Sequence, residues 1–230
     1  MCGITGILVG GDGAEARAIF KQLLIASEIR GQDGTGITIG QVDYDELKTQ
    51  VQVDRNQLVT FRSPLKASQA DLDTYLKYIG HASMAIAQNR LAIFGLGHEN
   101  DQPLVNDKAN VAIVHNGNLI AYEERFKYWK LPRKLQVDSE LILRIIEIFG
   151  IELAEDYLNA LDGDMAILAL ADNEQHESAI YAYRRYKPLF TVVVNRNRYF
   201  FSTERIGRKV FSAGIEFHKI EANRLHKYTI

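Results

Sequence analysis

The 230-residue sequence has little cysteine and little proline, and both shortages limit what the chain can be. Its only cysteine is Cys2, which excludes an internal disulfide and a zinc site built from several cysteines. The four prolines do not cluster, and no segment has the low complexity of a flexible linker. We therefore expect residues 1–230 to form a single domain.

The sequence also lacks an excess of charge of either sign and long hydrophobic runs. Lys and Arg number 27 against 29 Asp and Glu, so the net charge of −2 gives no basic field for binding nucleic acid. No apolar run approaches the roughly 20 residues that cross a bilayer, and no basic segment precedes a hydrophobic one at the N-terminus. These absences predict a cytoplasmic protein that acts on a small molecule, without a nucleic-acid or membrane partner.

Apolar periodicity predicts helices combined with antiparallel strands. Segments 14–29 and 138–150 repeat apolar residues at helical spacing, and a shorter helix is expected within 69–79. The other segments alternate, or are short apolar runs bounded by turns, as hairpin strands are. This order favours an α+β domain in which helices cover antiparallel sheets. The expected strands lie within 2–10, 36–42, 49–61, 80–87, 90–97, 110–117, 164–172, 178–185, 190–196, 199–204 and 220–230.

The position of Cys2 suggests a use for a lone thiol. If the initiator Met1 is removed, Cys2 carries both a thiol and a free α-amine. An α-amine has a pKa of about 7.7–8.0 and a thiol of about 8.5, so the amine can accept the thiol proton near neutral pH. From these residues alone two interpretations stay open: an N-terminal nucleophile, or a core cysteine that begins a buried strand.

Six short motifs follow one another in an order that is typical of one enzyme family. With this series the chain resembles the class II glutamine amidotransferases, whose glutaminase domain uses an N-terminal nucleophile. The resemblance implies a four-layer αββα sandwich, the Ntn-hydrolase fold, and one glutaminase domain over residues 1–230 with no synthase domain. The motifs are MCGITGI at 1–7, RGQDGTG at 30–36, GH at 80–81, QPL at 102–104, HNGNL at 115–119 and DSE at 138–140.

The resemblance assigns the chemical steps to three residues. Cys2 would attack the side-chain amide of glutamine to form a γ-glutamyl thioester, which water then hydrolyses. The Asn116 amide and the Gly117 N–H would form the oxyanion hole, where loss of one donor typically lowers the rate by ~10²–10³-fold. An Asn-Gly pair is also a common hairpin turn, which is the alternative interpretation of this motif.

The resemblance also implies binding and supporting residues. Asp138 would bind the α-ammonium group of glutamine, although the start of a predicted helix also suits it as an N-cap. His81, in the GH motif, is counted among the substrate-binding residues, while His81 and His115 also suit structural hydrogen bonding. Arg30 and Asp33 would be buried structural support beside the nucleophile.

The chain departs from the family pattern where an arginine should bind the α-carboxylate of glutamine through a bidentate hydrogen bond. The motif beginning at Gly80 places Ser83 where that arginine belongs, and a serine cannot make this contact. Arg90 lies at nearly the family spacing from Asn116 and is the substrate-binding residue that we expect instead.

These expectations define a glutaminase that needs no cofactor and no metal, since neither His81 nor His115 has partners at metal-ligand spacing. Its partners would be glutamine and a separate ammonia-accepting synthase, which should dock beside the active site on an exposed apolar patch. Two alternatives stay open: an amidohydrolase for another γ-glutamyl amide or peptide, and a catalytically degenerate regulatory subunit that retains Met1.

Overall fold

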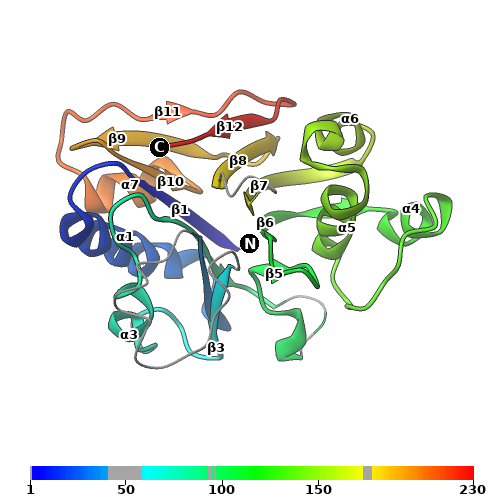
Figure 1. Ribbon diagram of the computed structural model, residues 1–230, viewed down its shortest axis with the longest axis horizontal. Helices are drawn as coiled ribbons and strands as arrows, with labels where there is room; N and C mark the ends of the chain where they lie inside the picture. Colours follow the sequence, from blue (N-terminus) through cyan, green and yellow to red (C-terminus); the bar gives the residue numbers. More distant parts are fainter. Residues whose placement is uncertain (1, 41–57, 93–94, 96, 173–177) are drawn as a thin grey trace.

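The structure is a computed structural model that describes residues 2–40, 58–92, 95, 97–172 and 178–230, and these form four layers (Figure 1). Two antiparallel sheets face each other, and helices cover the outer face of each. The expected α+β fold with αββα layers is therefore confirmed.

The first sheet has the strand order β11-β9-β10-β1-β4-β2-β3. Its central strand β1 pairs with β10 on one side and β4 on the other, so segments far apart in the sequence lie side by side. Asn195 and Arg196 join β9 to β10 with positive φ angles, as a two-residue hairpin turn requires. The strands are β1 (Gly3–Val9), β2 (Gly34–Gly40), β3 (Val59–Ser63), β4 (Met84–Arg90), β9 (Phe190–Val194), β10 (Asn197–Phe201) and β11 (His218–Lys219).

The second sheet has the order β12-β8-β7-β6-β5. The long strands β6 and β7 pair along their whole length, whereas the short β5 pairs only with Ala112 and Ile113 of β6. The later residues of β6 therefore lie at an edge that β5 does not cover. The strands are β5 (Leu104–Val105), β6 (Val111–Ile120), β7 (Asp162–Asp172), β8 (Ser178–Arg185) and β12 (His226–Tyr228).

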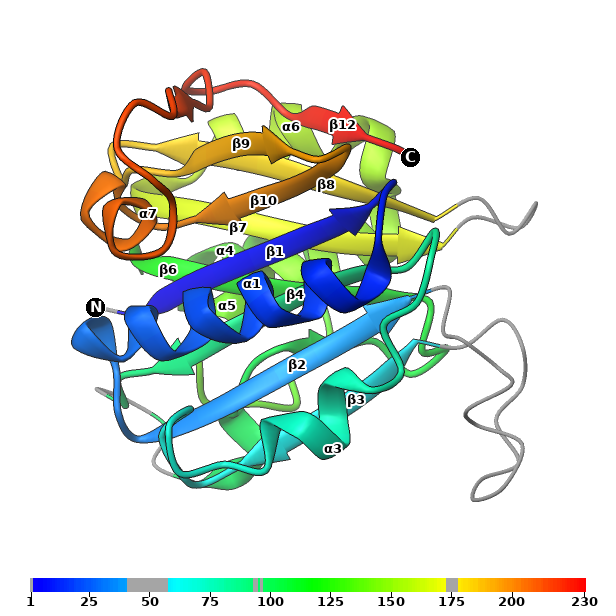
Figure 2. The ribbon, with the colours of Figure 1, turned by 90° about the vertical axis from the view of Figure 1, so that its left-hand side faces the viewer.

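The helices separate into two groups. Helices α1, α3 and α7 lie on the outer face of the first sheet, with α1 running across β1 and β4, and α4, α5 and α6 lie beyond the second sheet (Figures 1 and 2). No helix in the described part of the chain is long and apolar enough to cross a membrane. The α-helices are α1 (Gly13–Ser27), α3 (Leu72–Leu76), α4 (Tyr122–Tyr128), α5 (Ser139–Phe149), α6 (Ala154–Asn159) and α7 (Glu204–Val210); the 3-10 turns are η1 (Glu28–Arg30), η2 (His98–Asn100) and η3 (Ile151–Leu153).

Most of the elements expected from periodicity are present. The helices predicted within 14–29, 69–79 and 138–150 correspond to α1, α3 and α5. Helices α4, α6 and α7, each of seven residues or fewer, were not predicted. Helices this short give a weak periodic signal, although the equally short α3 was found. Most of the predicted strand at 49–61 lies outside the described residues, while Val59–Ser63 forms β3. The strand predicted at 90–97 is wrong for the residues described there: Arg90 ends β4, and Leu91, Ala92, Gly95 and Gly97 are not in a strand.

Three apolar layers stabilise the sandwich. One lies between α1 and the first sheet, a second lies between α5 and the second sheet, and the third fills the space between the two sheets. In that inner layer, apolar residues alternate along each strand because successive strand residues point to opposite faces. Ile4, Ile86 and Val114 belong to it and are fully buried.

The inner layer becomes polar at one end of the sandwich. Residues two positions apart on a strand share a face. Cys2 therefore shares the inner face with Ile4, Gln88 shares it with Ile86, and Asn116 shares it with Val114. The strands therefore bring a thiol and two amides to one end of the interior, although the three residues are far apart in the sequence.

Candidate active site

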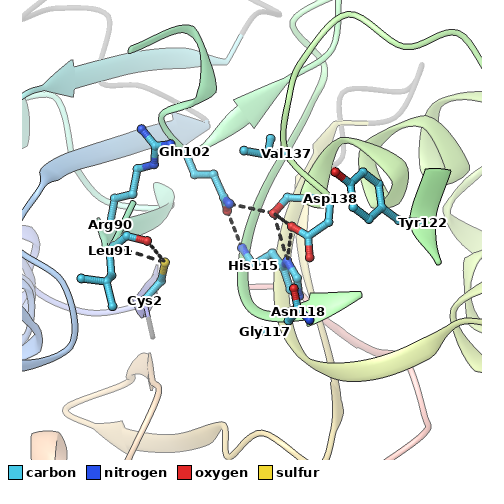
Figure 3. Close-up of a pocket in the computed structure, with 11 residues that line it drawn as sticks. Cys2, Arg90, Leu91, Gln102, His115, Gly117, Asn118, Tyr122, Val137 and Asp138 are labelled. Carbon is cyan, nitrogen blue, oxygen red and sulfur yellow. Dashed lines mark hydrogen bonds and ion pairs between the residues drawn. The ribbon is translucent and has the colours of Figure 1, made fainter. Parts of the chain in front are cut away.

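A cavity of about 340 Å³ opens at this polar end, between the first residues of the chain and the start of α5 (Figure 3). The chain segments around it come from both sheets and from α5, so the site depends on the whole fold. The lining residues on which the chemistry depends include Cys2, Arg90, Gln102, Gly117 and Asp138.

Cys2 is half-buried and lies against the end of β4. The Leu91 N–H donates to its Sγ at 3.4 Å, and the Sγ lies 3.8 Å from the Leu91 carbonyl oxygen, to which it can donate (Figure 3). Burial raises the pKa of the Cys2 thiol, while the hydrogen bond from Leu91 lowers it. Because burial is the larger effect, the thiol is protonated near neutral pH and needs a base before it can act as a nucleophile.

Arg30 and Asp33 hold the main chain around Cys2. The Arg30 Nε donates to the Cys2 carbonyl oxygen at 3.0 Å. The Asp33 carboxylate accepts a hydrogen bond from the Ala92 N–H at 2.8 Å, and the Asp33 N–H donates to the Arg90 carbonyl at 2.9 Å. The RGQDGTG motif thus contacts the chain on both sides of the Cys2 thiol. Asp33 is exposed and Arg30 is half-buried, so the expectation that both are buried is wrong.

Asn116 and Gly117 lie within β6 rather than in a turn, so the hairpin-turn interpretation of this motif is wrong. The Asn116 side chain is fully buried, and neither its Nδ2 nor its Oδ1 has a hydrogen-bond partner among the described residues. A buried amide without a partner destabilises a fold by about 1–3 kcal/mol. Its N–H donors are therefore not used by the described residues, and Asn116 is not among the residues that line the cavity.

Gly117 borders the cavity and leaves no room for a side chain. A Cβ atom there would collide with the Asp164 carbonyl oxygen and would lie 2.6 Å from the His115 Nε2. The close packing of β6 on β7 thus explains the glycine and leaves the main chain of Gly117 open to the cavity.

Asp138 occupies the N-cap position of α5 but makes no side-chain cap hydrogen bond. Its Oδ2 instead accepts a hydrogen bond from the Leu119 N–H at 2.7 Å, and its Oδ1 lies 3.3 Å from the Ser139 Oγ. The carboxylate borders the cavity (Figure 3), which is the geometry that a cationic group of a ligand requires.

His115 is a buried neighbour of Asp138. Its Nδ1 lies 2.9 Å from the Ser139 Oγ and 3.9 Å from the Asp138 Oδ1. Burial lowers the pKa of His115, and the Asp138 carboxylate acts in the opposite direction. Since burial is the larger effect, the imidazole is neutral near pH 7 and serves as a hydrogen-bonding group, the structural role that its residue type suggests.

Arg90, and not Ser83, lies at the cavity. Ser83 is buried at the opposite end of β4, where its Oγ accepts a hydrogen bond from the Gly80 N–H. The Arg90 guanidinium forms a buried ion pair with Asp101 and also donates to the carbonyl oxygens of Gly95 and Gly97. Figure 3 shows this guanidinium directed away from the Cys2 thiol.

His81 does not belong to the site, which corrects the expectation from the sequence. It is exposed in the turn before β4, near Gly11. The neighbouring Ala82 N–H donates to the Val9 carbonyl at the far end of β1 from Cys2. At about 3.3 Å per strand residue, this places His81 roughly 20 Å from the thiol.

Sequence reasoning missed several residues at the cavity. Tyr122 and Val137 line its wall, and the side chains of Gln102 and Ser139 join the polar network beneath it. The QPL motif was the one available signal for Gln102. Among the described residues no group of three His, Cys, Asp or Glu side chains could hold a metal ion.

The sequence matches the family described as "Glutamine amidotransferase domain" over residues 49–229. It is 28% identical over 213 residues to "Putative asparagine synthetase (glutamine-hydrolyzing) 1" of Methanocaldococcus jannaschii, covering 89% of this chain and 32% of the relative. It is also 28% identical over 202 residues to the glutamine–fructose-6-phosphate aminotransferase (isomerizing) of Staphylococcus aureus. This match covers 82% of this chain and 30% of the relative. The chain thus spans about a third of the length of these relatives.

Among solved structures, the chain resembles glutamine phosphoribosylpyrophosphate amidotransferase from B. subtilis. The TM-score is 0.72 at 19% sequence identity, and the match covers 99% of this chain and 49% of that one. At this identity the likeness concerns the fold, and it agrees with the αββα layers described above.

Proposed function

Because the chain belongs to the glutamine amidotransferase domain family, we propose that it hydrolyses the side-chain amide of glutamine and releases ammonia. The observation that carries the proposal is that one cavity brings together the Cys2 thiol, the Gly117 main chain and the Asp138 carboxylate. The family match begins at residue 49, so the role of Cys2 rests on this geometry and on the N-terminal motif.

In the first proposed step, removal of Met1 leaves a free α-amine on Cys2. This amine takes the thiol proton, and the thiolate attacks the amide carbon of glutamine. The carbonyl oxygen becomes an oxyanion that accepts hydrogen bonds from the Asn116 Nδ2 and the Gly117 N–H. When the tetrahedral intermediate collapses, the C–N bond breaks and the departing nitrogen takes the proton from the protonated α-amine of Cys2. Ammonia is released, and a γ-glutamyl thioester remains on Cys2.

In the second step, water attacks the thioester with the α-amine as base. The same two donors stabilise the second oxyanion, glutamate is released and the thiol regains a proton. The buried Asn116 amide, without a partner in the described part of the chain, supports this role because it has donors to offer and no competing acceptor.

For substrate binding we propose that Asp138 accepts hydrogen bonds from the α-ammonium group of glutamine. Arg90 is our proposed ligand for the α-carboxylate, since it borders the same cavity. Its buried ion pair with Asp101 means that the guanidinium has to turn, or to share its donors, when glutamine binds.

We further propose that the ammonia passes to a separate synthase that docks beside the cavity. Leu91, which lines the cavity, is 40% exposed, and Ile29, which borders a second hollow together with Leu91, is 48% exposed. The second hollow has a volume of about 420 Å³ and is formed by Leu91 and residues 28–33. Exposed apolar side chains next to the thiol suit a partner that excludes water.

The proposal is tested on the purified full chain by intact mass and by labelling with a diazo-ketone analogue of glutamine. We expect loss of one methionine, one covalent label on Cys2, and ammonia release from glutamine that Cys2→Ala abolishes while its melting temperature stays nearly unchanged. Retained Met1 with no labelling would favour the degenerate regulatory subunit. Hydrolysis of other γ-glutamyl amides with little activity on glutamine would favour the amidohydrolase.

A further inference from the structure

Gln102 is a buried residue in the cavity wall that the proposed chemistry does not use. It lies between η2 and β5 and is 7% exposed. Its main chain is pressed against β2, since a Cβ atom at Gly36 would collide with the Gln102 carbonyl and lie 2.8 Å from Pro103. The position of Gln102 is therefore fixed by packing before its side chain makes any hydrogen bond.

The side-chain amide of Gln102 makes three hydrogen bonds. Its Oε1 accepts from the His115 N–H at 2.6 Å and from the Gln88 Nε2 at 2.8 Å. Its Nε2 donates to the Ser139 Oγ at 2.8 Å. The three partners belong to β6, β4 and α5, so one amide joins both sheets and a helix.

Each of these elements also carries a part of the proposed site. His115 directly precedes Asn116 and Gly117, the proposed oxyanion donors. Gln88 lies on β4 three residues before Leu91, whose N–H contacts the Cys2 Sγ.

The third contact leads to the proposed ammonium site. Ser139 follows Asp138, and its Oγ lies 3.3 Å from the Asp138 Oδ1. Gln102 thus binds two residues that are direct neighbours of proposed binding groups. His115 precedes Asn116 on β6, and Ser139 follows Asp138 at the start of α5.

The hydroxyl of Ser139 has one proton to donate, so each of its hydrogen bonds has a defined donor and acceptor. It accepts from Gln102, and its one proton can go to the Asp138 Oδ1 or to the His115 Nδ1. If the Gln102 donor is lost, the hydroxyl loses the contact that orients its lone pairs. Among the described residues, the Leu119 N–H is then the partner of the Asp138 carboxylate that the change leaves untouched.

We propose that Gln102 is a positioning residue for both halves of the glutamine site. Through Ser139 it orients the Asp138 carboxylate toward the α-ammonium group, and through the His115 N–H it fixes the strand that holds the oxyanion donors. This inference rests on the proposed glutaminase function and adds residues to it that the family motifs do not assign.

The test uses the full chain and three variants. Gln102→Met removes all three hydrogen bonds at similar side-chain length. Ser139→Ala removes the connection from Gln102 to Asp138, together with the Ser139 contact to His115, and leaves the two hydrogen bonds that the Gln102 Oε1 accepts. Gln69→Met is the matched control, because Gln69 is an exposed glutamine outside the cavity. For each protein, kcat and KM are measured with glutamine and with 4-carbamoylbutanoate, which lacks the α-amine, and the melting temperature is recorded.

We expect Gln102→Met to lower kcat/KM for glutamine at least tenfold, with a fall in kcat and a rise in KM. Ser139→Ala should raise KM for glutamine about tenfold, with a smaller change in kcat and little change in either constant for 4-carbamoylbutanoate. The control should match the wild type.

Two results would overturn the inference. One is a Ser139→Ala variant that loses activity equally on both substrates, which would indicate a merely structural role. The other is a folded Gln102→Met variant with wild-type kinetics. A wild-type chain that releases no ammonia from glutamine would refute the proposed function itself, and the inference with it.

Discussion

The two halves of the candidate site are held in different ways. On the side of the first sheet, each contact of Cys2 involves the main chain, because the Leu91 N–H contacts its Sγ and the Arg30 side chain binds its carbonyl oxygen. On the side of the second sheet and α5, side chains bind side chains, with Gln102 and Ser139 at the centre. The comparison indicates that the nucleophile is positioned by the backbone of the sheet, whereas substrate recognition depends on a buried polar network.

The largest effect should come from the oxyanion donor, which belongs to the second half. Asn116→Ala is expected to lower kcat for glutamine by ~10²–10³-fold, because one of the two proposed donors is lost. Stability should not fall in proportion, since the variant also removes a buried amide that has no partner among the described residues. Steady-state kinetics and thermal unfolding check both parts, and an unchanged kcat would remove Asn116 from the mechanism.

The next effect should fall on binding alone. Asp138→Asn keeps an oxygen for the Leu119 N–H but removes the negative charge. We expect KM for glutamine to rise by roughly 10–100-fold, the range of a hydrogen bond to a charged group. Alkylation of Cys2 by iodoacetamide, which has no α-amine, serves as the control and should be within twofold of the wild type. A large loss in that control would mean that the substitution disturbs the first half as well.

A smaller effect is expected on the main-chain support of the first half. Asp33→Ala removes the acceptor for the Ala92 N–H, and the rate of Cys2 alkylation and kcat should each fall up to about tenfold. Asp33→Asn retains an oxygen acceptor, so its values should lie near those of the wild type. If both variants lose activity to the same extent, the charge of Asp33 matters rather than the main-chain contact; if both match the wild type, Asp33 does not support the nucleophile.

The smallest effect concerns the stability of the second half as pH changes. Burial lowers the pKa of His115, so on acidification the unfolded chain takes up this proton before the folded chain does. The contribution of His115 to the free energy of unfolding is therefore fully present above about pH 6.5 and declines as the pH falls toward the folded pKa. Urea unfolding at pH 7.5 and 5.5 should show a smaller loss for His115→Gln than for the wild type, and equal losses would contradict the assignment.

The layers and the residues proposed for the site could be predicted because the motifs that carry the family resemblance are local. A cysteine next to the initiator methionine, an Asn-Gly pair and an Asp before a helix are each readable in a few residues. The GH motif gave a wrong prediction for His81 as a substrate-binding residue, because a two-residue motif does not specify at which end of a strand it lies. The structure places it at the far end of β1 from Cys2.

The polar network could not be predicted for a different reason. Gln88 lies on β4, Ser139 on α5 and Gln102 in the connection before β5, and Gln102 and Ser139 are 37 positions apart. Nothing in the local sequence around a glutamine indicates that another strand will supply its hydrogen-bond partner. Only the stacking of the two sheets brings these amides and the hydroxyl together.

The close packing at Gly117 has a consequence for protein engineering. Since any side chain at this position would strike the Asp164 carbonyl, the floor of the cavity cannot be altered there without shifting β7. Tyr122, at the start of α4, and Val137 offer a wall that a designer can enlarge or narrow. Libraries aimed at a new amide substrate should therefore vary these two positions and leave Gly117 fixed.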